Sequence, residues 1–76
     1  MKLYVGGYLG FYSPGQQSEI ELTLSEPGSL DALLGEVGIP ASEVQLVLIN
    51  GERVDSVQSV VQNQDDVKIF PAVDGG

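Results

Sequence analysis

Hydrophobic and polar residues alternate near the start of the chain and predict an antiparallel pair of strands. From Lys2 to Tyr12, one set of alternate positions is mainly apolar, and the other carries Lys2 and the three tyrosines, Tyr4, Tyr8 and Tyr12. Because the side chains of a strand point alternately to its two faces, we predict a strand over Lys2–Tyr12, with Leu9 and Phe11 on the core side. A turn at 13–17 leads to Glu19–Leu24, where aliphatic residues again alternate with polar ones, and the two segments are expected to form a hairpin.

Leucine and valine recur at helical spacing in the next segment. The apolar positions follow i, i+3, i+4 and i+7, and they are Leu30, Leu33, Leu34 and Val37. This spacing places them on one face of a short helix. Ser29 can cap the start of the helix, and Gly38 followed by Pro40 provides its end. Because Gly35 lowers the helix propensity, the helix must depend on packing against a sheet.

Three further strands are predicted in the second half of the chain. Val44–Ile49 is apolar at both sets of alternate positions, which is typical of a strand covered on one face and partly on the other. Asn50-Gly51 predicts a two-residue turn into a short strand at 52–54. The last strand is expected at Val67–Pro71, with Val67 and Ile69 in the core. Strand pairing should end at the proline, because proline has no N–H to donate.

The remaining residues define the domain organisation. Residues 55–66 are mostly polar, and we expect a connecting segment that Val57, Val60 and Val61 hold to the body. The elements therefore follow the order strand, strand, helix, strand, short strand, strand, which predicts an α+β fold. A chain of 76 residues can bury one core. We expect one domain over residues 1–72 and a flexible tail at residues 73–76.

The chain is strongly acidic. Eleven acidic side chains against three basic ones give a net charge of −8. This charge repels phosphate backbones and anionic lipids, so neither nucleic acid nor a membrane surface is an expected partner. No apolar stretch approaches the ~20 residues of a membrane span, and we expect a cytoplasmic protein that binds basic partners.

Residue types that the chain lacks exclude most enzyme chemistry. Cys and His are absent, which removes thiolate nucleophiles, imidazole bases and the usual zinc sites. The adjacent carboxylates Asp65 and Asp66 have no further oxygen ligands spaced around them, so we predict no metal site. We therefore expect a protein that acts together with partner enzymes and is not itself an enzyme.

The sequence ends with Gly75-Gly76, a few residues after the proline that stops the last strand. Fully extended, Val73–Gly76 span roughly 13–14 Å, and the two glycines leave the end without side chains. Such a tail can enter a narrow passage in another protein. Its α-carboxylate is ionised at neutral pH and reacts only after activation, for example to an acyl-adenylate. A frayed end without function is the alternative interpretation.

Two segments of the second half resemble the MoaD/ThiS family of sulfur carriers. They are Val47–Val54, with the sequence Val-Leu-Ile-Asn-Gly-Glu-Arg-Val, and 65–76, with the sequence Asp-Asp-Val-Lys-Ile-Phe-Pro-Ala-Val-Asp-Gly-Gly. The ending from Phe70 resembles the Phe-Pro-Pro-Val-x-Gly-Gly ending of molybdopterin synthase small subunits and departs from it at Ala72. The resemblance implies the ubiquitin-like β-grasp fold, with a mixed sheet of about four or five strands packed on one short helix.

The resemblance also implies a mechanism. A ubiquitin-activating-type enzyme uses MgATP to adenylate Gly76, and a persulfide donor converts the adenylate to a thiocarboxylate. The sulfur then passes to a precursor held by a synthase large subunit or another sulfur-acceptor enzyme. Gly75 and Gly76 carry over directly as the reactive residues, and the carrier itself is expected to bind no cofactor. The receiving pathway stays open among molybdopterin, tungstopterin, thiamine and tRNA.

Activating enzymes of this family bind an apolar patch on the outer face of the sheet. Five residues are accordingly expected on this face as contacts with partners, namely Phe70, Tyr4, Tyr8, Val47 and Ile49. Asp74, in the tail, is expected to pair with a basic residue that lines a partner's channel. Gly6 and Arg53 occupy positions where family members commonly have apolar side chains, which leaves the identity of the partner open. The alternative for the tyrosines is a half-buried sheet face with hydrated hydroxyls. The alternative for Asp74 is a solvating role.

Two other functions share parts of this pattern. A ubiquitin-like modifier would use the same chemistry up to adenylation and end in an isopeptide bond between Gly76 and a lysine. A plain interaction domain would use the aromatic face, with the two glycines incidental. Mass spectrometry of the protein from its own cells separates the three functions, because only a carrier yields a thiocarboxylate and only a modifier yields conjugates.

Overall fold

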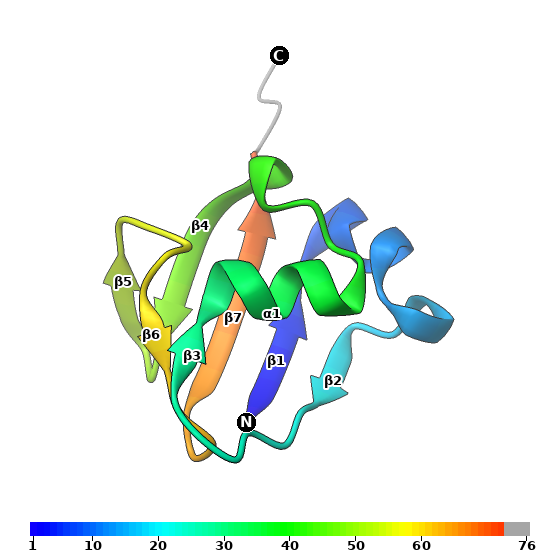
Figure 1. Cartoon of the computed structure of the whole chain (residues 1–76). Helices are drawn as coiled ribbons and strands as arrows, with labels where there is room; N and C mark the ends of the chain where they lie inside the picture. Colours follow the sequence, from blue (N-terminus) through cyan, green and yellow to red (C-terminus); the bar gives the residue numbers. More distant parts are fainter. Residues whose placement is uncertain (73–76) are drawn as a thin grey trace.

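A five-stranded mixed sheet packs one face against a single α-helix (Figure 1). The computed structural model describes residues 1–72. The strand order is β2-β1-β7-β4-β5, and the two central strands, β1 and β7, are parallel, whereas the other neighbours are antiparallel. The strands of this sheet are β1 (Lys2–Val5), β2 (Glu19–Glu21), β4 (Val44–Ile49), β5 (Glu52–Val54) and β7 (Asp66–Pro71). This arrangement confirms the predicted β-grasp fold.

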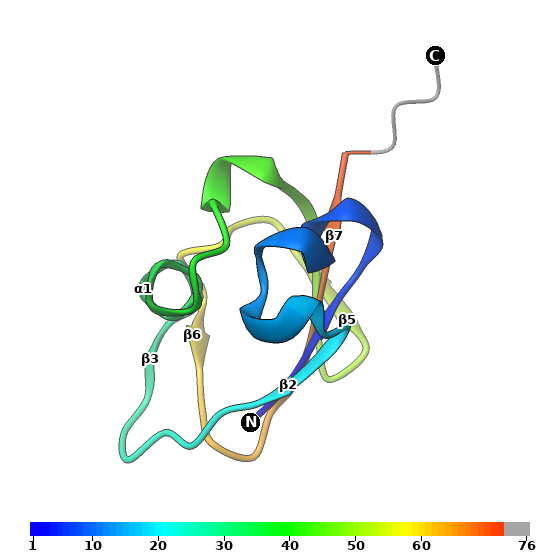
Figure 2. The same ribbon diagram turned by 90° about the vertical axis from the view of Figure 1, so that its right-hand side faces the viewer.

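Shorter elements complete the fold. Two short strands, β3 (Gly28–Ser29) and β6 (Val60–Val61), form a separate antiparallel pair. This pair lies on the same side of the large sheet as the helix α1 (Leu30–Val37) (Figure 2). The 3₁₀ segments are η1 (Gly7–Tyr12), η2 (Pro14–Gln16) and η3 (Ala41–Glu43).

The helix begins and ends where the sequence predicts. Ser29 Oγ accepts a hydrogen bond from the Ala32 N–H at 3.2 Å, as an N-cap does. Gly38 follows the last turn in the left-handed conformation, with φ of 90°, and its N–H bonds to the Leu34 carbonyl. Leu30 and Leu34 are fully buried, and the other two predicted apolar positions, Leu33 and Val37, pack against the same core.

The alternation of the last strand is also confirmed. Val67 and Ile69 are fully buried beneath the helix. Leu3 and Val5 of β1 pair with them in register and are buried as well. The core therefore lies between α1 and the two central strands, which the chain contributes from opposite ends of its sequence.

The predicted first strand is too long, because β1 ends at Val5. The Gly6 N–H still donates to the Ile69 carbonyl, at 2.8 Å, but Gly7 has a positive φ of 54° and turns the chain out of the sheet into η1. Leu9 is buried as predicted, whereas Phe11 is 72% exposed and lies outside the core. Figure 2 shows η1 and η2 spanning from the sheet toward α1.

Two further differences concern strand pairing. The hairpin partner β2 ends at Glu21 instead of Leu24, although Leu22 and Leu24 still pack against the core. In the segment predicted as a connection, Val60 and Val61 pair with Ser29 and Gly28, but the side chain of Val61 is buried whereas that of Val60 is 64% exposed and does not pack into the core. Nothing in the local sequence pattern distinguishes these two valines, because their difference follows from long-range pairing with β3.

The Asn50-Gly51 turn is formed as predicted and explains the adjacent carboxylates. Both turn residues have positive φ values, 53° and 84°. Asn50 Nδ2 donates to Asp65 Oδ1 at 3.0 Å, and Asn50 Oδ1 accepts from the Asp66 N–H at 2.9 Å. Asp65 Oδ2 also accepts from the Gln62 N–H at 2.8 Å, so Asp65 joins two turns. Within residues 1–72, no three acidic side chains gather as a metal site would require.

Candidate functional site

The last described residues lie at one end of the sheet, between two 3₁₀ segments. Because β7 is parallel to β1 and antiparallel to β4, its end adjoins both η1, which follows β1, and η3, which precedes β4 (Figure 1). Pro71 pairs with Val44, and a Cβ placed on Gly7 would lie only 2.9 Å from Pro71 Cγ. These contacts fix the position of residue 71. The predicted reactive residues Gly75 and Gly76, and the predicted contact residue Asp74, lie outside the described residues.

An apolar patch covers the centre of the outer sheet face, opposite the helix. The rings of Tyr4 and Phe70 pack at a centroid distance of 5.8 Å and an interplanar angle of 49°. Leu46 is in register with Phe70, and Leu48 is in register with Lys68, so both leucines share this face. We call these four residues the outer patch: Tyr4, Leu46, Leu48 and Phe70.

The structure contradicts the predicted orientation of two residues in β4. Val47 is in register with the buried Ile69 and is itself buried, and Ile49 packs against the same core. Both side chains therefore face the helix, and neither belongs to the outer patch. Leu46 and Leu48 take their place. Since both sets of alternate positions in β4 are apolar, only the register with β7 assigns the faces.

The predicted position of Tyr8 on the sheet is also wrong. Tyr8 and Tyr12 lie on η1, beyond the end of β1, and each is 43% exposed. The Tyr8 hydroxyl donates a long hydrogen bond, of 3.4 Å, to Glu43 Oε1 on η3. Partial desolvation, followed by the nearby charge of Glu43, raises the pKa of Tyr8 above its usual value of 10.0. The phenol is therefore neutral at physiological pH and remains a donor.

Phe70 fills the space above Gly6. A Cβ on Gly6 would lie 2.6 Å from Phe70 Cδ1, far inside normal contact distance. The Phe70 ring thus occupies the space that a side chain at position 6 would need, and the outer patch is apolar at this point.

All three basic residues of the chain lie on the outer face. Lys68 and Arg53 are in register with Leu48, and Lys2 is on the same side of β1 as Tyr4. Lys2 Nζ forms an exposed ion pair with Glu19 Oε1 at 3.5 Å. Three acidic residues share this face through the ladder, namely Glu19, Glu21 and Asp66. The strand positions of the outer face, all within residues 1–72, therefore carry three charges of each sign, whereas the chain as a whole carries −8.

A groove continues the outer face beside Tyr4. It has a volume of about 270 Å³ and is lined on its far side by Phe11 and Gln16 of η1 and η2. Phe11, which the strand prediction places in the core, is therefore an exposed residue at the edge of this groove. Among residues 1–72, no helix has the length and apolar character needed to cross a bilayer.

Comparisons with known proteins agree with this geometry. Over 99% of its length, the chain is similar to 97% of SAMP1 from Haloferax volcanii, whose crystal structure superposes with a TM-score of 0.68 at 19% sequence identity. This similarity shows the β-grasp fold. A search of curated proteins gave no match. The family comparison is more specific, because residues 8–76 match the ThiS family, including both terminal glycines. The chain therefore belongs to the ThiS family of ubiquitin-like sulfur carrier proteins.

Proposed function

We propose that this protein carries sulfur as a thiocarboxylate on Gly76 and works with a ubiquitin-activating-type enzyme and a sulfur-acceptor enzyme. The observation that carries the proposal is the family match, which extends through Gly75 and Gly76. A second feature supports it. The strand that leads toward these glycines ends at Pro71, at the rim of the sheet and next to the outer patch.

The proposed chemistry has three steps. A carboxylate oxygen of Gly76 attacks the α-phosphorus of MgATP on the activating enzyme, and pyrophosphate leaves. The terminal sulfur of a persulfide donor then attacks the acyl carbon, and AMP leaves. A thiol cleaves the resulting acyl persulfide, so that the S–S electrons remain on the thiocarboxylate and the thiol becomes part of a disulfide. The carrier supplies only the carboxylate and the surface that presents it, and we expect the reaction in the cytoplasm.

The outer patch is the proposed contact with the activating enzyme. Tyr4 and Phe70 supply aromatic area next to the root of the tail, and truncating such an anchor typically costs ~1–2 kcal/mol of binding free energy or more. Leu46 and Leu48 extend the same surface across β4. Which pathway receives the sulfur depends on the second partner.

The test uses variants of the tail in ATP–pyrophosphate exchange with the activating enzyme of the same cells. We expect deletion of Gly76 to abolish exchange, because the carboxylate moves back by one residue, about 3.5 Å, from the α-phosphate. Gly75→Val should act similarly, since it adds a branched side chain beside the reactive carbonyl. Gly28→Val is the matched control. Gly28 lies in β3, outside the tail, and a Cβ added there meets no atom within 4 Å.

Mass spectrometry of protein purified from its own cells provides the second readout. A carrier shows the mass shift of one oxygen replaced by sulfur, and the shift disappears in the Gly76 deletion. Conjugates to lysine, without a thiocarboxylate, would instead show a ubiquitin-like modifier. Wild-type exchange rates in both tail variants would refute the proposal.

A further inference from the structure

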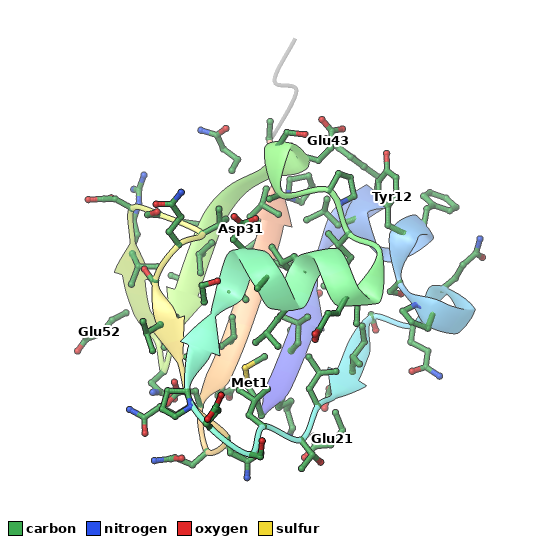
Figure 3. The ribbon with its side chains drawn as sticks, in the orientation of Figure 1. Met1, Tyr12, Glu21, Asp31, Glu43 and Glu52 are labelled. Atoms are coloured by element: carbon green, nitrogen blue, oxygen red, sulfur yellow. The ribbon has the colours of Figure 1, made fainter. Side chains whose placement is uncertain are left out.

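Three side chains form a corner beside the end of β7, separate from the outer patch. Tyr8 and Tyr12 come from η1, and Glu43 comes from η3. The contact of 3.4 Å between the Tyr8 hydroxyl and Glu43 Oε1 links the two segments. Figure 3 shows Tyr12 and Glu43 at the end of the molecule where β7 ends. We call these three residues the tail-root corner.

The packing of the body does not account for this corner. Each tyrosine leaves 43% of its surface exposed, whereas Leu9, from the same segment, is fully buried and supplies the packing. The hydroxyl contact of 3.4 Å is well beyond the ~2.7–2.8 Å that O–H···O bonds usually show. Within residues 1–72, the second carboxylate oxygen of Glu43 has no hydrogen-bond partner. The corner therefore keeps aromatic area and acceptor capacity available for a further group.

The charge at this end of the molecule indicates whether the bound group should be a cation or an anion. Glu43 is the single charged residue in the segments 7–17 and 38–45, which build this end of the molecule. The three basic residues of the chain lie on the outer sheet face instead. A carboxylate beside the Tyr8 hydroxyl, with the exposed ring of Tyr12 on the same 3₁₀ segment as Tyr8, attracts a cation by its charge, and the negative faces of the rings add to the attraction. A planar guanidinium suits such a place best, because it stacks on aromatic rings and donates to a carboxylate at the same time.

We propose that the tail-root corner binds an arginine side chain of the activating enzyme, beside the passage that receives the tail. This inference rests on the proposed function, because it assigns a contact to the same partner. In this proposal the partner contacts the corner from the side of η1 and η3, whereas it contacts the outer patch from the face of the sheet. Two contacts on different sides of one strand fix the direction in which the tail leaves the body.

The test compares two glutamates that lose the same charge. Glu43→Gln removes the carboxylate of the corner, and Glu52→Gln removes an exposed carboxylate on β5, far from Tyr12 and the end of β7 (Figure 3). ATP–pyrophosphate exchange is measured against carrier concentration at low and high salt. We expect Glu43→Gln to raise KM about tenfold, the usual loss for one hydrogen bond to a charged group, and to weaken the salt dependence. Glu52→Gln should change KM less than twofold, as a rim charge does.

A second variant tests the rings while keeping the charge. Tyr12→Leu removes one aromatic face, and we expect KM to rise about two- to fivefold, which matches an exposed cation–π contact. Thermal denaturation of each variant verifies the fold. Equal KM values for Glu43→Gln and Glu52→Gln, in an enzyme that still requires Gly76, would overturn the corner and leave the proposed function intact. If the wild-type protein supports no ATP–pyrophosphate exchange, both the tail-root corner and the proposed function are overturned.

Discussion

The contact between Gly6 and Phe70 gives a quantitative test of the outer patch. In Gly6→Ala, the new methyl carbon would lie 2.6 Å from Phe70 Cδ1 and 3.0 Å from Cε1. Carbon atoms prefer separations of ~3.5–4.0 Å, so the ring must move by about 1 Å. Forcing an extra methyl group into packed side chains costs ~1–3 kcal/mol. The half-buried ring can tilt toward solvent, which places the expected cost in the lower half of this range, at ~1–2 kcal/mol.

The substitution also has a stabilising effect, because alanine restricts the backbone of the unfolded chain more than glycine does. Gly6 has φ of −85° and ψ of 156°, which alanine adopts without strain. Where alanine fits, replacing glycine stabilises by ~0.4–1 kcal/mol because the unfolded chain loses freedom. We therefore expect Gly6→Ala to destabilise the wild type by about 1 kcal/mol and to be neutral or stabilising in a Phe70→Ala background, a coupling of ~1–2 kcal/mol. The contact with the Ile69 carbonyl oxygen, at 3.1 Å, is present in both backgrounds and cancels.

Urea denaturation of the four proteins of this cycle measures the coupling. The chain has no Trp, so far-UV circular dichroism or tyrosine fluorescence reports unfolding. Gly35→Ala is the control, because an added Cβ at this helical glycine meets nothing within 4 Å and should stabilise both backgrounds equally. The same destabilisation by Gly6→Ala with and without the Phe70 ring would refute the contact.

Two further predictions concern the core and the corner. Leu34→Ala should lower the free energy of unfolding by ~2–5 kcal/mol in urea denaturation, since Leu34 is fully buried. Leu33→Ala should cost less because that side chain is only partly buried. Equal losses in the two variants would contradict the orientation of the helix. Because the pKa of Tyr8 is raised, its contribution to stability is fully present below the unfolded pKa of ~10 and is lost as pH rises through the folded value. The stability difference between wild type and Tyr8→Phe should therefore fall above pH ~10 in urea titrations, and a constant difference would contradict the raised pKa of Tyr8.

Local signals in the sequence sufficed for the helix and for the tight turn. Ser29 and Gly38 act within one helical turn of their own positions, and Asn50-Gly51 adopts the two positive φ values that a two-residue turn requires. The positions of these features follow from such local residues, which is why they are predicted to the residue. Distant contacts stabilise them without moving their boundaries, since Asn50 bonds to Asp65 and Asp66 and the helix packs against the sheet.

The length of β1 and the faces of β4 depend on distant contacts. Residues 7–12 continue the alternation of β1, yet the strand ends where Gly7 turns the chain and η1 packs Leu9 into the core. In β4 the residues on both faces of the strand are mainly apolar, and a shift of the pairing by one residue moves each side chain to the other face of the sheet. Pairing of Val47 with Ile69 decides the outcome, and no pattern within β4 contains that information.

The distribution of charge explains how an acidic protein can present a binding face whose positive and negative charges balance. The outer face balances Lys2, Arg53 and Lys68 against three acidic residues, so the excess of eight acidic side chains belongs to the rest of the chain. The long-range attraction that we expect for a basic partner therefore acts on the rest of the chain, and it accelerates encounter without drawing the partner to the outer patch. Orientation must come from short-range contacts, namely the apolar area of Tyr4 and Phe70 on the sheet. A corner that combines Glu43 with exposed rings serves both roles at once, because its charge belongs to the acidic excess and its rings confine the cation to one place beside the end of β7.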